Sequence, residues 1–328
     1  MGMVADSLDG DGVAGRRDSM AGSLIENPLA ETLTMADGRT VEWEAIGAGP
    51  PLIWVEGGPG LWAHLARPDV ALVSDLFRCH LVNAPGCGRT SLPADISGYD
   101  LPGIIAFFDQ LREGLGLGRV TVMGHSWGGL VAAAWAAAHP ESVERLVVID
   151  GYPGGSANPG SAVDREAARA EQERAIVRHA GQPWYDAACD AAVRTLADDT
   201  ERDEQTWISR VDPAWHLYFA DPSSRLSAPH LARIRTEVRM NMAMHYAWFG
   251  DIHRFDDVDI LPSLAAVTCP SLVIAGQHDF ICGPAWNQPI AEAIPAARFV
   301  EIADAGHLPQ YEQPDSFRAA LLDWLATC

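Results

Sequence analysis

The sequence predicts an α/β protein with a mostly parallel central sheet flanked by helices. Short apolar segments rich in β-branched residues alternate along the chain with helical segments. The later strand segments are near-continuous apolar runs, as expected of parallel strands that are covered on both faces. A third observation is that residues 151–262 have helical patterns but no convincing strand, and this interval is too long for a loop. It therefore predicts an inserted helical cap.

The individual elements follow in order from composition and periodicity. Residues 1–27 are rich in Gly, Asp and Ser and predict a disordered tail. A hairpin is expected within Leu29–Ile46, about the turn ADGR. The other expected strands are Pro51–Glu56, Arg78–Asn83, Arg119–Met123, Arg145–Asp150, Ser271–Gly276 and Ala297–Ala303, and the expected core helices are Leu101–Leu115 and Leu130–Ala138. Residues 28–150 and 263–328 would form the core, and residues 151–262 the cap over the carboxyl edge of the sheet.

Composition limits the class of protein. The 328 residues carry a net charge of −21, which argues against nucleic acid or an anionic membrane as a partner. All 23 basic residues are arginine, which we interpret as a GC-rich, bacterial genome. The six cysteines have no metal-binding or paired spacing, so we expect reduced thiols, a cytoplasmic location and no metal or cofactor. No signal peptide or transmembrane run is expected, and the oligomeric state is left open.

The segment VTVMGHSWGGLVAAAWAAAHP places Ser126 between a strand and an alanine-rich helix. A turn this sharp forces its apex residue into an unfavourable backbone region, and such strain tends to be kept where it serves a site. Gly124 and Gly128 let the strand and the helix pack closely on either side. The pattern predicts Ser126 as a nucleophile and the Trp127 N–H as an oxyanion donor. The alternative is a tight turn with a capping serine.

A serine nucleophile needs a base, and the base needs an acid that orients it. His307 in ADAGHLP follows the last strand, and Asp279 in AGQHDF follows the preceding one. Both would lie at the carboxyl edge of the sheet with Ser126, so we predict the triad Ser126, Asp279 and His307. Asp150 is a second candidate acid. A surface-loop histidine and a turn-forming aspartate are the alternatives.

The histidines that precede these residues, His125 and His278, are expected to point away from the site. The second oxyanion donor is expected in EGGPG, Glu56–Gly60, where glycines allow close approach of the backbone to a substrate. Gly58 is the candidate, and an ordinary Gly-Pro turn is the alternative.

Four motifs carry a resemblance to a known family: GGPG at Gly57–Gly60, GHSWGG at Gly124–Gly129, GQHDFIC at Gly276–Cys282 and AGHLPQYEQPDSF at Ala305–Phe317. Over about Leu29–Leu325 the chain resembles the α/β-hydrolase superfamily, and within it the proline iminopeptidase group of serine peptidases. The resemblance implies the same nucleophile, acid, base and oxyanion donors as the residue patterns predict.

Three stretches depart from that group. Glu56 stands where the group has histidine, and NAPGCGRT, residues 83–90, replaces its Asp-Gln-Arg-Gly loop. The group binds the free amine of its substrate with cap glutamates, one of them just before a His-Tyr pair, but here Ala243 and Met244 precede His245–Tyr246. Glu237 and Asp251 are the nearby alternative carboxylates. This pattern predicts little preference for a free amine.

The cap is rich in aromatic and methionine residues, which either line an apolar pocket or pack the cap onto the core. The candidate substrate-binding residues are Glu56, Met244, His245, Tyr246 and Trp248. The sequence therefore predicts a cofactor-independent serine hydrolase that cleaves an ester, thioester or amide of a small substrate with an apolar portion. The alternatives are an iminopeptidase-type aminopeptidase and a lyase-like or ligand-binding relative.

Overall fold

The computed structural model describes residues 30–155, 161–197, 203–250 and 258–328. By its internal contacts the chain divides into Met1–Ala30 and Glu31–Cys328, and the description below concerns the second unit. The predicted tail, residues 1–27, lies outside the described residues.

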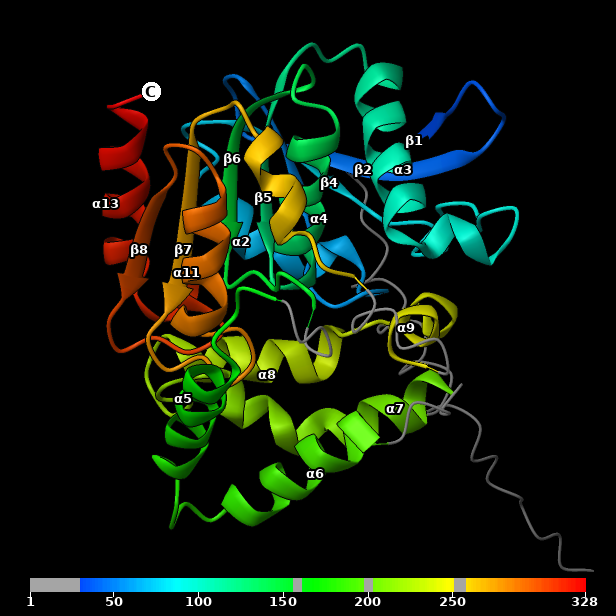
Figure 1. The fold of residues 1–328 in the computed structure, drawn as a ribbon. Helices are drawn as coiled ribbons and strands as arrows, with labels where there is room; N and C mark the ends of the chain where they lie inside the picture. The colour runs from blue at the N-terminus through cyan, green and yellow to red at the C-terminus, as the bar shows by residue number, and fades with distance from the viewer. Residues whose placement is uncertain (1–29, 156–160, 198–202, 251–257) are drawn as a thin grey trace, which may run out of the picture. The chain divides into compact units, whose positions relative to one another are not determined.

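Eight strands form one sheet in the order β1-β2-β4-β3-β5-β6-β7-β8 (Figure 1). The hairpin β1–β2 is antiparallel, β2 is antiparallel to β4, and all the other neighbours are parallel. The mostly parallel sheet predicted from the sequence is confirmed. The strands are β1 (Glu31–Thr34), β2 (Thr40–Ile46), β3 (Pro51–Val55), β4 (Arg78–Val82), β5 (Val120–His125), β6 (Val143–Ile149), β7 (Ser271–Gly276) and β8 (Arg298–Ile302).

Helices cover both faces of this sheet, and the alternation of side chains along each strand decides which helix a residue meets. In β3, Ile53 and Val55 belong to the apolar cluster that contains α3 (Leu101–Gly114) and α4 (Trp127–Ala138). Leu52 and Trp54 belong to the cluster on the other face, with α2 (Arg67–Ala71) and α13 (Pro314–Leu325). This two-sided burial explains why the central strands read as unbroken apolar runs.

Helix α4 is buried along nearly its whole length, which matches its alanine-rich sequence. Eleven of its twelve residues are buried, and small side chains allow the backbone to lie close to the sheet. The helix stops at His139, since the following Pro140 disfavours helical geometry at the residue before it.

The segment between β6 and β7 is helical, and within its described residues it contributes no strand to the sheet. The strands β6, β7 and β8 point towards these helices (Figure 1). An isolated bridge between Leu61 and Met240 joins the segment to the loop after β3. Its elements are α5 (Arg165–Val177), α6 (Tyr185–Ala197), α7 (Glu204–Val211), η3 (Asp212–Tyr218), α8 (Ser227–Glu237), α9 (Met242–Phe249) and η4 (Leu261–Ala266).

The remaining described helices are short or peripheral. They are η1 (Ala63–Ala66), η2 (Ile96–Tyr99), α11 (Pro284–Ala293) and α12 (Pro309–Glu312). No helix in the described ranges combines the length and apolar character that crossing a membrane requires.

Candidate active site

A cavity of about 590 Å³ lies where the loops at the carboxyl edge of the sheet meet the helices between β6 and β7. Ser126 and His307 both line it, with Gly58 and Trp127. Its helical side is mostly apolar and aromatic, as in many small-molecule sites. The apolar and aromatic residues from that side are Trp207, Val211, Trp215, Tyr218, Ile234, Val238, Met240, Trp248 and Phe249.

Ser126 occupies the sharp turn between β5 and α4 with φ 55° and ψ −122°. This confirms the expected strained backbone, which a residue with a side chain rarely adopts. The neighbouring glycines are required by close packing: a Cβ on Gly124 would lie 2.1 Å from the Gly128 carbonyl oxygen, and a Cβ on Gly128 would lie 2.1 Å from that of Val55. The turn therefore fixes Ser126 against the end of β3.

His307 and Asp279 form a buried pair at the same edge. The Nδ1 atom of His307 lies 2.7 Å from Oδ2 of Asp279, and the two side chains are 3% and 0% exposed. Because Nδ1 donates to the carboxylate, Nε2 is the nitrogen left to accept a proton. Ser126 contributes to the same cavity wall, so the three predicted residues are brought to one place.

Backbone hydrogen bonds and the Glu312 carboxylate hold the loop that carries His307. The His307 N–H donates to the Tyr218 carbonyl at 2.8 Å. The buried carboxylate of Glu312 accepts the N–H groups of Gly306 at 2.5 Å and of Ala220 at 3.1 Å. Glu312 thus ties the histidine loop to the helical segment, a role that sequence reasoning missed because it depends on a contact 92 residues apart.

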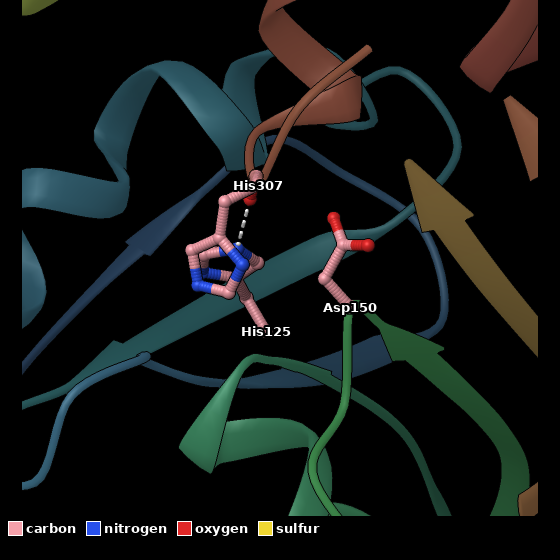
Figure 2. Close-up of side chains that lie close together, drawn as sticks. All are labelled: His125, Asp150 and His307. Atoms are coloured by element: carbon pink, nitrogen blue, oxygen red, sulfur yellow. Dashed lines mark hydrogen bonds between the residues drawn. The ribbon is translucent and has the colours of Figure 1, made fainter. Parts of the chain in front are cut away.

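The expectation for His125 is wrong. Its ring does not point away from the site: it lies 4.7 Å from the ring of His307, and its Nε2 donates to the His307 carbonyl at 2.7 Å (Figure 2). Burial and the positive charge of a protonated His307 lower the pKa of His125 to about 3, so the ring stays neutral. His278, in contrast, lines a separate cavity of about 340 Å³, as expected of a side chain that faces away.

Asp150 lies beside the pair, fully buried at the end of β6 with φ 44° (Figure 2). Its Oδ1 accepts the Gly276 N–H at 2.7 Å. Burial, and then the charge of Asp279, raise the pKa of Asp150 well above its ordinary value. The protonated form of Asp150 is therefore favoured, whereas Asp279 makes the direct bond to the histidine.

These side chains also bear on metal binding. His125, Asp150 and His307 each offer one ligand atom within 4.8 Å of the others. However, Nε2 of His125 and Nδ1 of His307 are already used in the hydrogen bonds described above. A metal ion held by those two nitrogens would have to replace both bonds, so the donor set fits the histidine–carboxylate pair better than a metal centre.

The two predicted oxyanion donors face the same cavity. Trp127 is the first residue of α4, so its N–H has no acceptor within the helix and lies at the positive end of the helix dipole. Gly58 has φ +58°, the left-handed region that glycine enters most easily, and it also lines the cavity. Both residues therefore line the cavity that contains Ser126.

Comparison with known proteins gives the family. The profile of the alpha/beta hydrolase fold matches residues 50–314, which is most of the chain. The chain belongs to the α/β-hydrolase family.

Relatives of this α/β-hydrolase have low identity and diverse activities. It is 28% identical over 291 residues to the pimeloyl-[acyl-carrier protein] methyl ester esterase of Edwardsiella ictaluri, covering 86% of this chain and 96% of that protein. It is 24% identical over 284 residues to the proline iminopeptidase of Heyndrickxia coagulans, with 85% and 91% covered. It is 23% identical over 304 residues to the bifunctional epoxide hydrolase 2 of Sus scrofa. That match covers 88% of this chain, which spans about half (54%) of the pig protein.

Solved structures give the same fold. An alpha/beta fold family hydrolase from Bacillus anthracis str. Sterne superposes with a TM-score of 0.70 at 20% identity, covering 90% of this chain and 98% of that one. At this identity the likeness concerns the fold.

The structure separates the candidate substrate-binding residues of this α/β-hydrolase into two groups. Glu56, His245 and Trp248 line the cavity. Met244 is fully buried in the core cluster with α3 and α4, and neither it nor Tyr246 belongs to the cavity lining, so the structure contradicts their assignment. The sequence motif located the right helix, but only two of the four candidates on it face the cavity.

The two alternative carboxylates do not take their place. Glu237 pairs with Arg233 at 3.0 Å and is absent from the cavity lining, and Asp251 lies outside the described residues. Sequence reasoning also missed Asp69 of α2, which lines the cavity with Glu56. No sequence signal distinguishes Asp69 from a solvated helical aspartate.

Proposed function

We propose that this α/β-hydrolase is a serine hydrolase that cleaves an ester, thioester or amide of a small substrate with an apolar portion. The observation that carries the proposal is that Ser126, in its strained turn, shares one cavity with the buried His307–Asp279 pair. Binding alone would have no need of such an arrangement, since strain and buried charge both cost stability.

The proposed reaction has two halves. Ser126 Oγ attacks the carbonyl carbon while His307 Nε2 takes its proton, and the Gly58 and Trp127 N–H groups stabilise the oxyanion. The carbonyl re-forms, the bond to the leaving group breaks, and His307 gives the proton to that group. Water then attacks the acyl-enzyme with the same base and releases the acid. Asp279 holds the imidazole in the required tautomer.

The apolar walls support a hydrophobic acyl or leaving group. Two relatives whose whole length is nearly matched are named as an ester hydrolase and a peptidase, so both ester and amide substrates are included in the proposal. A cytoplasmic location stays a prediction from cysteine usage, and all six cysteines are free thiols in the structure.

A fluorophosphonate probe tests the nucleophile directly. The wild type should be labelled at Ser126, Ser126→Ala should not be labelled, and p-nitrophenyl butyrate should be hydrolysed only by the wild type. Labelling at another serine, or unchanged hydrolysis by Ser126→Ala, would overturn the mechanism. A panel of p-nitrophenyl esters, thioesters and amino-acid anilides then ranks the leaving groups.

A further inference from the structure

One part of the cavity wall is acidic, and the proposed reaction makes no use of it. The carboxyl groups of Glu56, in the loop after β3, and Asp69, on α2, both line the cavity that contains Ser126. His230 and Arg233 of α8 and Tyr311 of α12 line the same cavity. Acidic groups are rarely placed in a largely apolar pocket unless something compensates their charge.

Neutral donors satisfy only part of the bonding capacity of these carboxyls. Asp69 accepts from the Gln310 amide and from the Tyr311 hydroxyl, each at 2.6 Å. Glu56 accepts from the indole N–H of Trp54 at 3.0 Å. In the described part of the chain, neither Glu56 nor Asp69 forms an ion pair with a basic side chain.

The charge of Arg233 lowers the pKa of both Glu56 and Asp69, but Arg233 forms no ion pair with either carboxyl. Its guanidinium pairs with Glu237 at 3.0 Å and donates to the Leu65 carbonyl. The group therefore consists of three carboxyls, Glu56, Asp69 and Glu237, and a single guanidinium. Burial lowers the pKa of His230 to about 3 and raises that of Tyr311, so both of these neighbours are neutral at pH 7.

His230 supplies an independent sign that a polar ligand belongs here. It is 8% exposed, lines the cavity and stacks on Tyr311 with ring centroids 3.6 Å apart. Among the residues that the structure describes, its ring has aromatic neighbours but no hydrogen-bond partner. A neutral imidazole always offers one donor and one acceptor nitrogen, and a polar ligand in the cavity could pair with them.

We propose that Glu56 and Asp69 bind an ammonium group of the substrate, with His230 as a further polar contact. The surrounding tryptophans would hold the apolar body of the same molecule, so an organic amine fits this cavity better than a bare metal ion. The position of that amine relative to a carbonyl at Ser126 rests on the proposed hydrolase function. The binding of the cation does not.

This proposal differs from the sequence-based prediction of little preference for a free amine. The sequence pattern directed attention to the cap, whereas the two carboxyls come from the loop after β3 and from α2. The sequence predicts Glu56 as a substrate-binding residue that departs from the family pattern. The structure places Asp69 in the wall of the same cavity.

Binding of an ammonium group should change the protonation of the two carboxyl groups, and this change can be measured. Burial, and then the charge of Asp69, raise the pKa of Glu56 to about 8, and burial raises that of Asp69 to about 6. At pH 7 the empty site therefore holds about one proton. A bound cation favours the charged carboxylates and lowers both pKa values, so the proton should be released when an ammonium binds.

The test uses Ser126→Ala protein, which cannot turn over a substrate by the proposed mechanism. Calorimetric titration at pH 7 compares benzylammonium with benzyl alcohol, in two buffers of different ionisation enthalpy. We expect benzylammonium to bind about thirtyfold more tightly or better, with proton release that the alcohol does not cause. Adding Glu56→Gln or Asp69→Asn should remove most of the difference. Glu171→Gln, a partly buried carboxylate outside this cavity, is the control and should leave it unchanged.

Equal binding of the two probes, or an ammonium preference that survives in both Glu56→Gln and Asp69→Asn, would overturn the proposal. So would variants that melt at lower temperature yet keep the preference, because Asp69 would then only anchor α12. Fluorophosphonate labelling of Ser126 reports the hydrolase function separately. Ammonium binding without labelling would keep the site and reject the hydrolase, and labelling without ammonium preference would do the reverse.

Discussion

Two carboxyl groups lie near His307, and replacing each of them by an amide should lower kcat by very different factors. In Asp279→Asn an amide replaces the carboxylate 2.7 Å from Nδ1 of His307. The amide favours the wrong imidazole tautomer, so we expect kcat to fall about 10⁴-fold, or roughly 5.4 kcal/mol of transition-state stabilisation. In Asp150→Asn the amide oxygen can still accept the Gly276 N–H that Asp150 Oδ1 accepts. We expect a loss of about tenfold or less.

For the pH dependence of the free energy of unfolding, in contrast, the substitution of Asp150 should have the larger effect. Because the pKa of Asp150 is raised in the folded protein, folding takes up a proton at every pH between the unfolded value, about 3.9, and the raised one. The free energy of unfolding then falls by up to about 1.4 kcal/mol per pH unit as pH rises through that window. Asp150→Asn removes this contribution, so its stability relative to the wild type should increase as pH rises above the unfolded value.

Urea unfolding at pH 5, 6 and 7, together with kcat for p-nitrophenyl butyrate, checks both statements on the same preparations. The reasoning fails if Asp150→Asn loses more activity than Asp279→Asn, because Asp150 would then be the acid. It also fails if the stability difference between Asp150→Asn and the wild type does not change with pH, since the Asp150 carboxyl would then be charged in the folded protein.

Three further substitutions test the site. Ser126→Ala should lower kcat by a factor on the order of 10⁶, and more than a few per cent residual activity would reject Ser126 as the nucleophile. Gly128→Ala places a Cβ 2.1 Å from the Val55 carbonyl oxygen and should cost about 3 kcal/mol or more of stability by urea unfolding. His125→Ala leaves the buried His307 carbonyl without its donor at 2.7 Å, which should cost about 1–3 kcal/mol by urea unfolding. Unchanged stability in Gly128→Ala or in His125→Ala would contradict the contacts from which these losses are predicted.

Local pattern was sufficient for the elements of the sheet, because apolar runs and turn residues are properties of neighbouring positions. The strand Ser271–Gly276 has the same bounds in the sequence prediction and in the structure, and the hairpin pairs Glu31 with Trp43 as the ADGR turn allows. The meeting of Ser126, Asp279 and His307 at one edge also follows from strand ends, since each was predicted just beyond a strand.

The rest depends on contacts between distant segments. Nothing near Asp69 in the sequence announces Tyr311, which is 242 residues away and donates to it. The alternation of side chains along β5 indicates which face of the sheet His125 lies on. It does not indicate that the loop after β8 brings the His307 carbonyl to the His125 ring. On α9 the periodicity could not tell which residues face the cavity, because all but a few of its side chains are apolar.

The site contains two pairs of neighbouring carboxyl groups, Asp150 with Asp279 and Glu56 with Asp69, and the repulsion of like charges is relieved differently in each. Asp279 has His307, which becomes positive during the proposed reaction, so a charged Asp150 beside it would add a second negative charge with no cation to match. The raised pKa of Asp150 favours its protonated form, which lacks that charge. In the described chain Glu56 and Asp69 form no ion pair, and Arg233, whose charge lowers the pKa of both, is itself paired with Glu237. That pair must either keep a proton or receive a positive charge from outside the protein.

The net charge of −21 acts in the same sense, because the field of the whole molecule attracts cations and repels anions. The chemistry of the reacting groups therefore does not choose between ester and amide, but the proposed ammonium site and the net charge of the protein are both consistent with a substrate that carries an amine.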